Sequence, residues 1–276
     1  MSNGPGLFTD IGKKAKDVLT ANYTTDQKLS VNSCSESGLI FTSTALKKGG
    51  LSTGDIAAKY KYKNVLIDVK FDTESKVLTT FTFTEIVPST KTIASLKFPD
   101  FDSCKLEVQY FHHHATFTTA VSMKQAPTVD FSATLGTPKI AFGAEVGYDT
   151  TSSSFTKYTA GVSVSKPDSC ASIIVGDKGD SIRASYLHYL DQSKKNAVVA
   201  EITRKLSSNE NTVTVGGSYA VNPLTSIKGK LNNNGKLGAL LQHELVPKSI
   251  LTISSEVDTR ALDRIPKLGL SIALVP

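Results

Sequence analysis

Lysines separated by a single residue are the side chains of this sequence best suited to bind or attract a ligand. Lys59 and Lys61 form one such pair, and Lys228 and Lys230 form another. Residues two apart in a β-strand point to the same face, so each pair would place two ammonium groups side by side. Such a face is either a solvated strand edge or part of a lumen whose summed positive field attracts anions.

Three consecutive histidines, His112, His113 and His114, could in principle hold a metal ion. Strand neighbours point to opposite faces, and no acid or cysteine lies at ligand spacing, so we expect a strand end or turn and no metal site. The sequence has no GxSxG, P-loop or HExxH motif, and Gly216-Gly217 lacks the surroundings of a dinucleotide loop. We therefore predict a protein that is not an enzyme and takes no cofactor.

Composition narrows the choice of class. The chain has 276 residues, 39% of them hydrophobic, and a net charge of +6, which predicts a folded protein. Its apolar runs are shorter than the roughly 18 residues of a spanning helix, and it begins without the apolar stretch of a signal peptide. Cys34, Cys104 and Cys170 show no CxxC spacing and are expected to be free thiols. The basic residues are mostly dispersed lysines, so no nucleic acid is expected as a specific ligand.

From residue 27 to the end, apolar and polar residues alternate with period two, which predicts strands. Val65, Ile67, Val69 and Phe71 form one apolar set. We expect about nineteen strands joined by short turns, at 27–33, 38–46, 53–62, 65–73, 76–86, 91–98, 103–111, 114–123, 128–136, 138–149, 155–165, 169–177, 181–190, 195–205, 211–221, 224–232, 236–244, 249–257 and 266–275.

Two architectures fit this pattern: a soluble sandwich of antiparallel sheets, or a membrane barrel with an apolar outer face and a polar lumen. Runs of about ten residues have the length of tilted strands that cross a bilayer. The sequence lacks the tryptophan common in sandwich cores, and tyrosines near run ends suit an interfacial girdle: Tyr60, Tyr62, Tyr110 and Tyr148. We therefore favour the barrel.

The first twenty residues follow a different period. Leu7, Ile11, Ala15 and Val18 recur every three or four residues, while Asp10, Lys13, Lys16 and Asp17 take other faces. This pattern predicts a short amphipathic helix, with a membrane-surface helix or a presequence as the alternatives.

Three segments resemble the voltage-dependent anion channel family in its plant form: Leu7 to Thr20, Gly38-Leu39-Ile40-Phe41-Thr42-Ser43, and the ending Lys267 to Leu274. The similarity covers the whole chain. That family is known for a barrel of 19 strands, so our strand count is not independent of the resemblance.

The resemblance implies an all-β transmembrane barrel of residues 27–276, closed by parallel first and last strands, and an N-terminal segment of residues 1–26 whose helix lies in the lumen. It implies a voltage-gated, weakly anion-selective pore of the mitochondrial outer membrane that passes ATP, ADP, phosphate and small metabolites. The partners would be membrane lipid, these permeant anions and the outer-membrane assembly machinery, with a second copy of the chain also considered. A protein-import channel of the same fold and a soluble ligand-binding sandwich remain the alternatives.

The resemblance also implies roles for individual residues that match positions of the family. Lys13 and Lys16 match basic positions of the lumenal helix, and Asp10 matches a carboxylate there, with Ile11 and Asp17 alongside. Lys97, in Ser95-Leu96-Lys97, stands where the family often has a Gly-Leu-Lys motif linked with nucleotide contact. We place Lys13, Lys16, Lys59, Lys61, Lys97, Lys228 and Lys230 along the pore. The glycine-rich hinge of animal members is replaced by residues 22–26, and their membrane-facing glutamate by Val69, so functions tied to either are not transferred.

The last strand resembles the assembly signal of mitochondrial barrels, a polar residue, a glycine and two hydrophobic residues at fixed spacing. Lys267, Gly269, Ile272 and Leu274 match it, and an ordinary closing strand is the alternative.

Overall fold

The computed structural model describes residues 4–100, 103–261, 263 and 266–275. Its strands are β1 Gln27–Cys34, β2 Leu39–Lys48, β3 Leu51–Tyr62, β4 Val65–Asp72, β5 Val77–Thr84, β6 Thr90–Phe98, β7 Lys105–Phe111, β8 Ala115–Ser122, β9 Thr128–Gly136, β10 Ile140–Asp149, β11 Ser154–Ser165, β12 Ser169–Gly176, β13 Ser181–Tyr189, β14 Ala197–Lys205, β15 Glu210–Asn222, β16 Thr225–Asn232, β17 Lys236–Val246, β18 Ser249–Asp258 and β19 Lys267–Leu274. Within the described ranges, no helix is long and apolar enough to cross a membrane.

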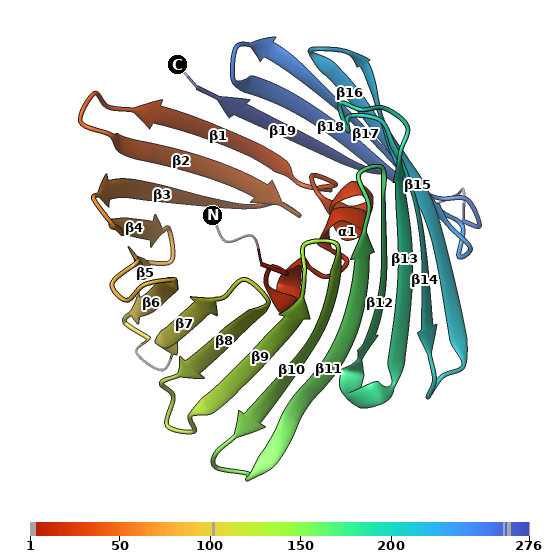
Figure 1. The fold of residues 1–276 in the computed structure, drawn as a ribbon. Helices are drawn as coiled ribbons and strands as arrows, with labels where there is room; N and C mark the ends of the chain where they lie inside the picture. Colours follow the sequence, from red (N-terminus) through yellow and green to blue (C-terminus); the bar gives the residue numbers. More distant parts are fainter. Residues whose placement is uncertain (1–3, 101–102, 262, 264–265, 276) are drawn as a thin grey trace.

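The strands form one sheet that closes on itself (Figure 1). Each strand pairs antiparallel with the next, and β1 pairs parallel with β19, with Gln27 opposite Leu270 and Val31 opposite Leu274. Closure leaves no strand edge with unpaired backbone groups, and so satisfies the rule for backbone inside a bilayer. The predicted nineteen-stranded barrel is confirmed, and the soluble-sandwich alternative is wrong.

Alternation along each strand separates an outer from an inner face. Tyr60 of β3 pairs with Ile67 of β4, and Lys59 with Asp68, so apolar and charged residues lie on opposite faces across strands as well as along them. Many large hydrophobic side chains are exposed on the outer face, among them Phe71 and Ile253. An exposed apolar belt of this kind is expected where the solvent is lipid.

The predicted strand boundaries agree with the structure to within a few residues. The run predicted at 76–86 ends earlier, at Thr84, because Glu85 has a positive φ of 60° and begins a turn closed by the bond from the Thr90 amide to the Val87 carbonyl. Alternation of apolar and polar residues predicts the position of a strand well. It does not show where the backbone leaves the extended conformation.

Residues 7–20 of the N-terminal segment lie inside the barrel (Figure 1) and contain two helical pieces. A 3₁₀ turn, η1, spans Phe8–Asp10, and the α-helix α1 spans Lys13–Thr20. Gly12 between them has a φ of 74°, a left-handed conformation that glycine adopts readily. The single helix we expected is therefore corrected: Asp10 and Ile11 precede α1, and only Asp17 of the three predicted helix residues belongs to it.

Candidate functional site: the barrel lumen

The N-terminal segment is seated on one side of the inner wall. Its most buried side chains are Phe8, Ile11, Ala15 and Leu19. Phe8 and Ile11 lie directly over Gly143 of β10, where an added Cβ would come within 2.7 Å of the Phe8 ring. Of the expected stripe of Leu7, Ile11, Ala15 and Val18, Ile11 and Ala15 are buried, and Val18 is partly buried against the same cluster.

An apolar patch on the inner wall receives the helix. Leu187 of β13 and Val199 of β14 have no exposed surface, and they pack with Ala197 against Ala15 and Leu19. A lumenal face that holds water is otherwise polar, so these inward apolar residues mark where the helix docks. Alternation with period two does not predict them, although Ala197-Val198-Val199-Ala200 is a continuous apolar run that indicates a strand covered on both faces.

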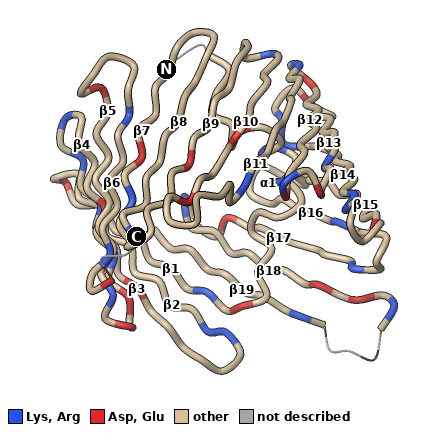
Figure 2. The backbone as a smooth tube through the Cα atoms, turned by 90° about the horizontal axis from the view of Figure 1, so that it is seen from below, with Lys and Arg blue, Asp and Glu red and all other residues tan. Residues whose placement is uncertain are grey.

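The lysines predicted to line the pore belong to inward-facing positions. Lys59 and Lys61 lie on β3, Lys97 on β6, and Lys228 and Lys230 on β16, each on the face opposite the exposed apolar belt. Lys13 and Lys16 lie on α1 within the barrel. Figure 2 shows blue and red segments distributed around the wall and the helix.

Several lumenal cations carry acidic partners. Lys59 Nζ lies 3.1 Å from a carboxylate oxygen of Asp68, and Lys70 Nζ lies 2.9 Å from one of Asp55. On the helix side, Lys13 lies 3.7 Å from Asp10. Opposite charges in contact largely cancel beyond their own separation, so these pairs add little net field to the lumen.

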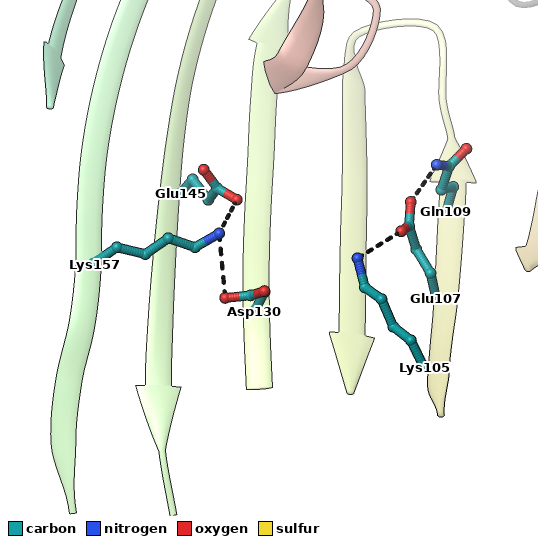
Figure 3. Close-up of polar contacts among 6 residues, drawn as sticks. All are labelled: Lys105, Glu107, Gln109, Asp130, Glu145 and Lys157. Atoms are coloured by element: carbon teal, nitrogen blue, oxygen red, sulfur yellow. Dashed lines mark hydrogen bonds and ion pairs between the residues drawn. The ribbon is translucent and has the colours of Figure 1, made fainter. Parts of the chain in front are cut away.

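A second group of ion pairs lies on β7 to β11 (Figure 3). Lys157 Nζ donates to Glu145 at 2.7 Å and lies 3.3 Å from Asp130. Beside it, Glu107 accepts from Lys105 at 3.2 Å and from the amide of Gln109. Acidic residues bind every lysine in this group, which makes this sector of the wall unsuited to attract anions.

Other lumenal lysines lie without acidic contacts. Among the described residues, Lys16, Lys61, Lys97 and Lys228 make no ion pair within 4.0 Å, and all eight ion pairs of that part of the chain involve other cations. Lys228 lies near enough to Asp17 of α1 for an electrostatic interaction without contact. Lysines without an ion-pair contact therefore lie on the helix and on β16, which face each other.

Lys230 is held by an aromatic ring. Its Nζ lies 4.2 Å from the ring centroid of Tyr23, a cation–π distance. Burial raises the pKa of Tyr23 to about 12, so the phenol is neutral at physiological pH. The Tyr23 hydroxyl is buried without a hydrogen-bond partner in the described structure. Sequence reasoning singled out Lys230 but had no signal for this contact across two hundred residues.

The remaining predicted sites are placed as follows. His112–His114 form the turn between β7 and β8, closed by the His112 amide and the Ala115 carbonyl, as predicted. The described ranges contain no group of three His, Cys, Asp or Glu residues arranged to hold a metal ion. Cys34, Cys104 and Cys170 are free thiols. On β19, Lys267 and Gly269 point inward, whereas Ile272 and Leu274 share the outer face.

Comparison with known proteins agrees with this architecture. Residues 4–269 match the family model described as eukaryotic porin. The chain is 64% identical to mitochondrial outer membrane protein porin 2 of Arabidopsis thaliana over 100% of both chains. It is 58% identical to mitochondrial outer membrane protein porin 5 of Oryza sativa subsp. japonica over 99% of both, and 44% identical to the outer plastidial membrane protein porin of Pisum sativum over 100% of both.

These matches confirm the expected family, function class and location. The relatives are named porins, and the family is one of channels, in agreement with a closed barrel whose apolar face points outward. The chain belongs to the eukaryotic porin family, and it is a voltage-dependent pore for metabolites in the mitochondrial outer membrane.

Proposed function

We propose that the pore is weakly anion-selective and that it passes ATP, ADP, phosphate and small organic anions by diffusion. Unpaired lumenal lysines raise the local concentration of anions through their summed field, and salt weakens this effect as the Debye length shortens. Such a field gives a preference among permeants and no tight binding. No chemical step is assigned to the chain.

The size of the barrel supports diffusion of metabolites. Nineteen strands spaced ~4.8 Å apart and tilted ~40° give a ring roughly 38 Å across, measured between backbones. A helix about 10 Å thick against one side narrows such a passage without filling it.

The observation that carries the selectivity proposal is the contrast between paired and unpaired lysines. Within the part of the chain that the structure describes, Lys228 and Lys16 lack an acidic partner within 4.0 Å, whereas Lys59, on the inner face of β3, contacts Asp68. We therefore assign selectivity to Lys16, Lys61, Lys97, Lys228 and Lys230. Lys13 and Lys59 keep only a minor part of the role that the sequence predicts for them.

A planar-bilayer measurement tests this assignment. Lys228→Gln combined with Lys230→Gln removes two positive charges that make no ion-pair contact in the described structure, and it should move the reversal potential in a KCl gradient toward cation preference. The matched control, Lys59→Gln combined with Asp68→Asn, removes one charge of each sign and should leave the reversal potential near the wild-type value. Equal reversal potentials for the first variant and the wild type would contradict the assignment.

The organisation of the chain and its partners complete the proposal. We treat residues 1–26 as the N-terminal segment and residues 27–276 as the barrel. Lys267, Gly269, Ile272 and Leu274 are proposed to be read by the outer-membrane assembly machinery as β19 arrives. Self-association is proposed to use the apolar outer face, since the lumenal face is enclosed.

A further inference from the structure

The last residues of the N-terminal segment cross the inner face of the closing strands. Ser254 of β18, only 3% exposed, hydrogen-bonds both backbone polar groups of Thr24: its hydroxyl donates to the Thr24 carbonyl and accepts from the Thr24 amide at 3.3 Å. Two residues later, the Leu270 amide donates to the Asp26 carbonyl at 3.2 Å. The segment is thus fixed to the wall before β1 begins.

Gly269 of β19 lies directly beneath this crossing. A Cβ built on Gly269 would come within 2.0 Å of the Thr24 carbonyl oxygen and 2.8 Å of the Ser254 hydroxyl. Gly269 lies in a regular strand and its φ is not positive, so its backbone conformation suits any residue. The need for glycine therefore comes from the close approach of Thr24, because a real Cβ does not approach a backbone oxygen so closely.

The preceding residue is packed in the same way. The Tyr23 ring lies under the ammonium group of Lys230, and a Cβ on Gly238 of β17 would come within 2.8 Å of Lys230 Cε and 3.2 Å of Tyr23 Cε1. Gly238 and Gly269 lie on the inner face, on strands that flank β18. Two adjacent residues of the segment thus rest on two glycines of the wall.

An outward glycine provides the contrast. Gly229 of β16 lies in a regular strand, and a Cβ there would meet nothing within 4 Å. A bare backbone is therefore not a general need of these strands.

We propose that Ser254 and Gly269 are positioning residues that hold the end of the N-terminal segment against the wall, and so keep α1 docked beside the ion path. The proposal rests on the barrel and on the contacts of Thr24, and it is independent of the anion selectivity assigned above. It gives Gly269 a lumenal role whether or not the assembly machinery reads the same glycine.

Native cysteines offer a direct readout in full-length channels reconstituted in liposomes. Cys170 is partly buried against the cluster in which Ala15 and Leu19 of α1 meet the wall. Cys34, by contrast, is exposed. The rate at which a charged maleimide modifies Cys170, divided by its rate at Cys34, reports whether α1 leaves the wall. We expect this ratio to rise roughly fivefold in Gly269→Ala, which corresponds to about 1 kcal/mol of lost docking energy at 1.4 kcal/mol per tenfold.

Two further variants make the test decisive. Ser254→Ala removes both hydrogen bonds to Thr24 without adding bulk and should raise the ratio in the same direction. Gly229→Ala is the matched control and should behave as the wild type. Single-channel current should become noisier in Gly269→Ala and Ser254→Ala, as the helix moves in and out of the ion path. It should stay as in the wild type in Gly229→Ala.

Each outcome bears on the proposal. If Gly269→Ala does not insert, Ser254→Ala decides, because the signal on β19 is intact in that variant. A wild-type modification ratio and quiet current in inserted Ser254→Ala channels would overturn the proposal. A ratio that rises equally in Gly229→Ala would also overturn it, since the effect would then reflect general loosening of the barrel.

Discussion

Lysines that point into the lumen differ in how much net charge they contribute. The difference depends on whether a residue on a neighbouring strand supplies a carboxylate. Lys59 and Lys228 both point inward, yet Lys59 contacts Asp68, whereas Lys228 contacts no carboxylate of the described residues within 4.0 Å. The first pairing could have been predicted, because β3 and β4 are joined by the two-residue turn Lys63-Asn64, which fixes their register. The Tyr23–Lys230 contact could not, because no local pattern relates residues so far apart.

Substitutions on the two faces of one strand should separate lipid from lumen. Val215, 49% exposed near the middle of β15, faces outward, and Thr214 faces inward beside Glu201. Val215→Arg places a charge in the bilayer at a cost of about 2 to 4 kcal/mol near the midplane, so membrane integration should fall. Thr214→Arg should integrate normally because its charge meets water and a carboxylate. Carbonate-resistant integration of both variants to the same level would argue against the assigned faces.

Strand β18 is less suited to the same pair of substitutions, because its inward threonine is packed against other residues. The apolar set Leu251, Ile253 and Val257 on β18 would suggest Ile253→Arg, with Thr252→Arg as its inward partner. Thr252 is only 8% exposed and accepts a hydrogen bond from Gln242. An arginine there would disturb packing for reasons unrelated to lipid, which alternation alone could not reveal.

At the scale of elements, period two predicts the strands well because every strand separates lipid from lumen. The pattern also weakens where the inner face is covered. Leu187 and Val199 are apolar although they point inward, because α1 excludes water from that part of the wall. In the N-terminal segment Phe8 and Leu19 are buried more fully than Leu7 and Val18, and Gly12 joins a 3₁₀ turn to a separate helix. A left-handed residue is not visible to a hydrophobicity pattern.

Loops outside the strands also carry specific links. Asp180, between β12 and β13, accepts from the amide of Ser207 at 2.7 Å and from its hydroxyl at 2.6 Å, and so joins two loops at one rim. The bonds from the Ser207 side chain and backbone, together with nearby Lys205, hold the pKa of the Asp180 carboxyl below its usual value.

This link should depend on pH in a defined direction. A carboxyl whose pKa is lowered in the folded state stabilises at pH values above its unfolded pKa, and the effect is lost as pH falls through the lower folded value. The protection of the Ser207 amide against hydrogen exchange should therefore be constant near neutral pH and decrease below the usual aspartate pKa of about 3.9. Asp180→Ala should lose this protection at every pH, while Asp177→Ala should not. If protection of the Ser207 amide stays constant well below the usual aspartate pKa, the ionised form of Asp180 is not needed for the link between the two loops.

At the scale of the molecule, the closed barrel turns scattered charges into a shared field. In the sector from β7 to β11, two lysines contact three carboxylates, whereas the helix and β16 carry lysines that make no acidic contact within the described ranges. The charge of the lumen is therefore uneven around its circumference. Length, composition and alternation predicted the barrel, but this unevenness depends on register and helix docking.

Charge reversal tests the field as a whole. Lys61 points inward from the end of β3 and contacts no acidic residue among those that the structure describes, and Lys13 lies on α1 beside Asp10. Lys13→Glu combined with Lys61→Glu replaces two positive charges with two negative ones inside the barrel. The reversal potential in a KCl gradient should move toward cation preference, most strongly at low ionic strength, where the Debye length is about 30 Å at 0.01 M against 3 Å at 1 M. Thermal stability should change little, because lumenal substitutions alter selectivity more than folding.

A shift of equal size at both salt concentrations would mean that the lysines act by local contact with the permeant ion. An unchanged reversal potential in a conducting variant would mean that these two side chains do not influence the ion path.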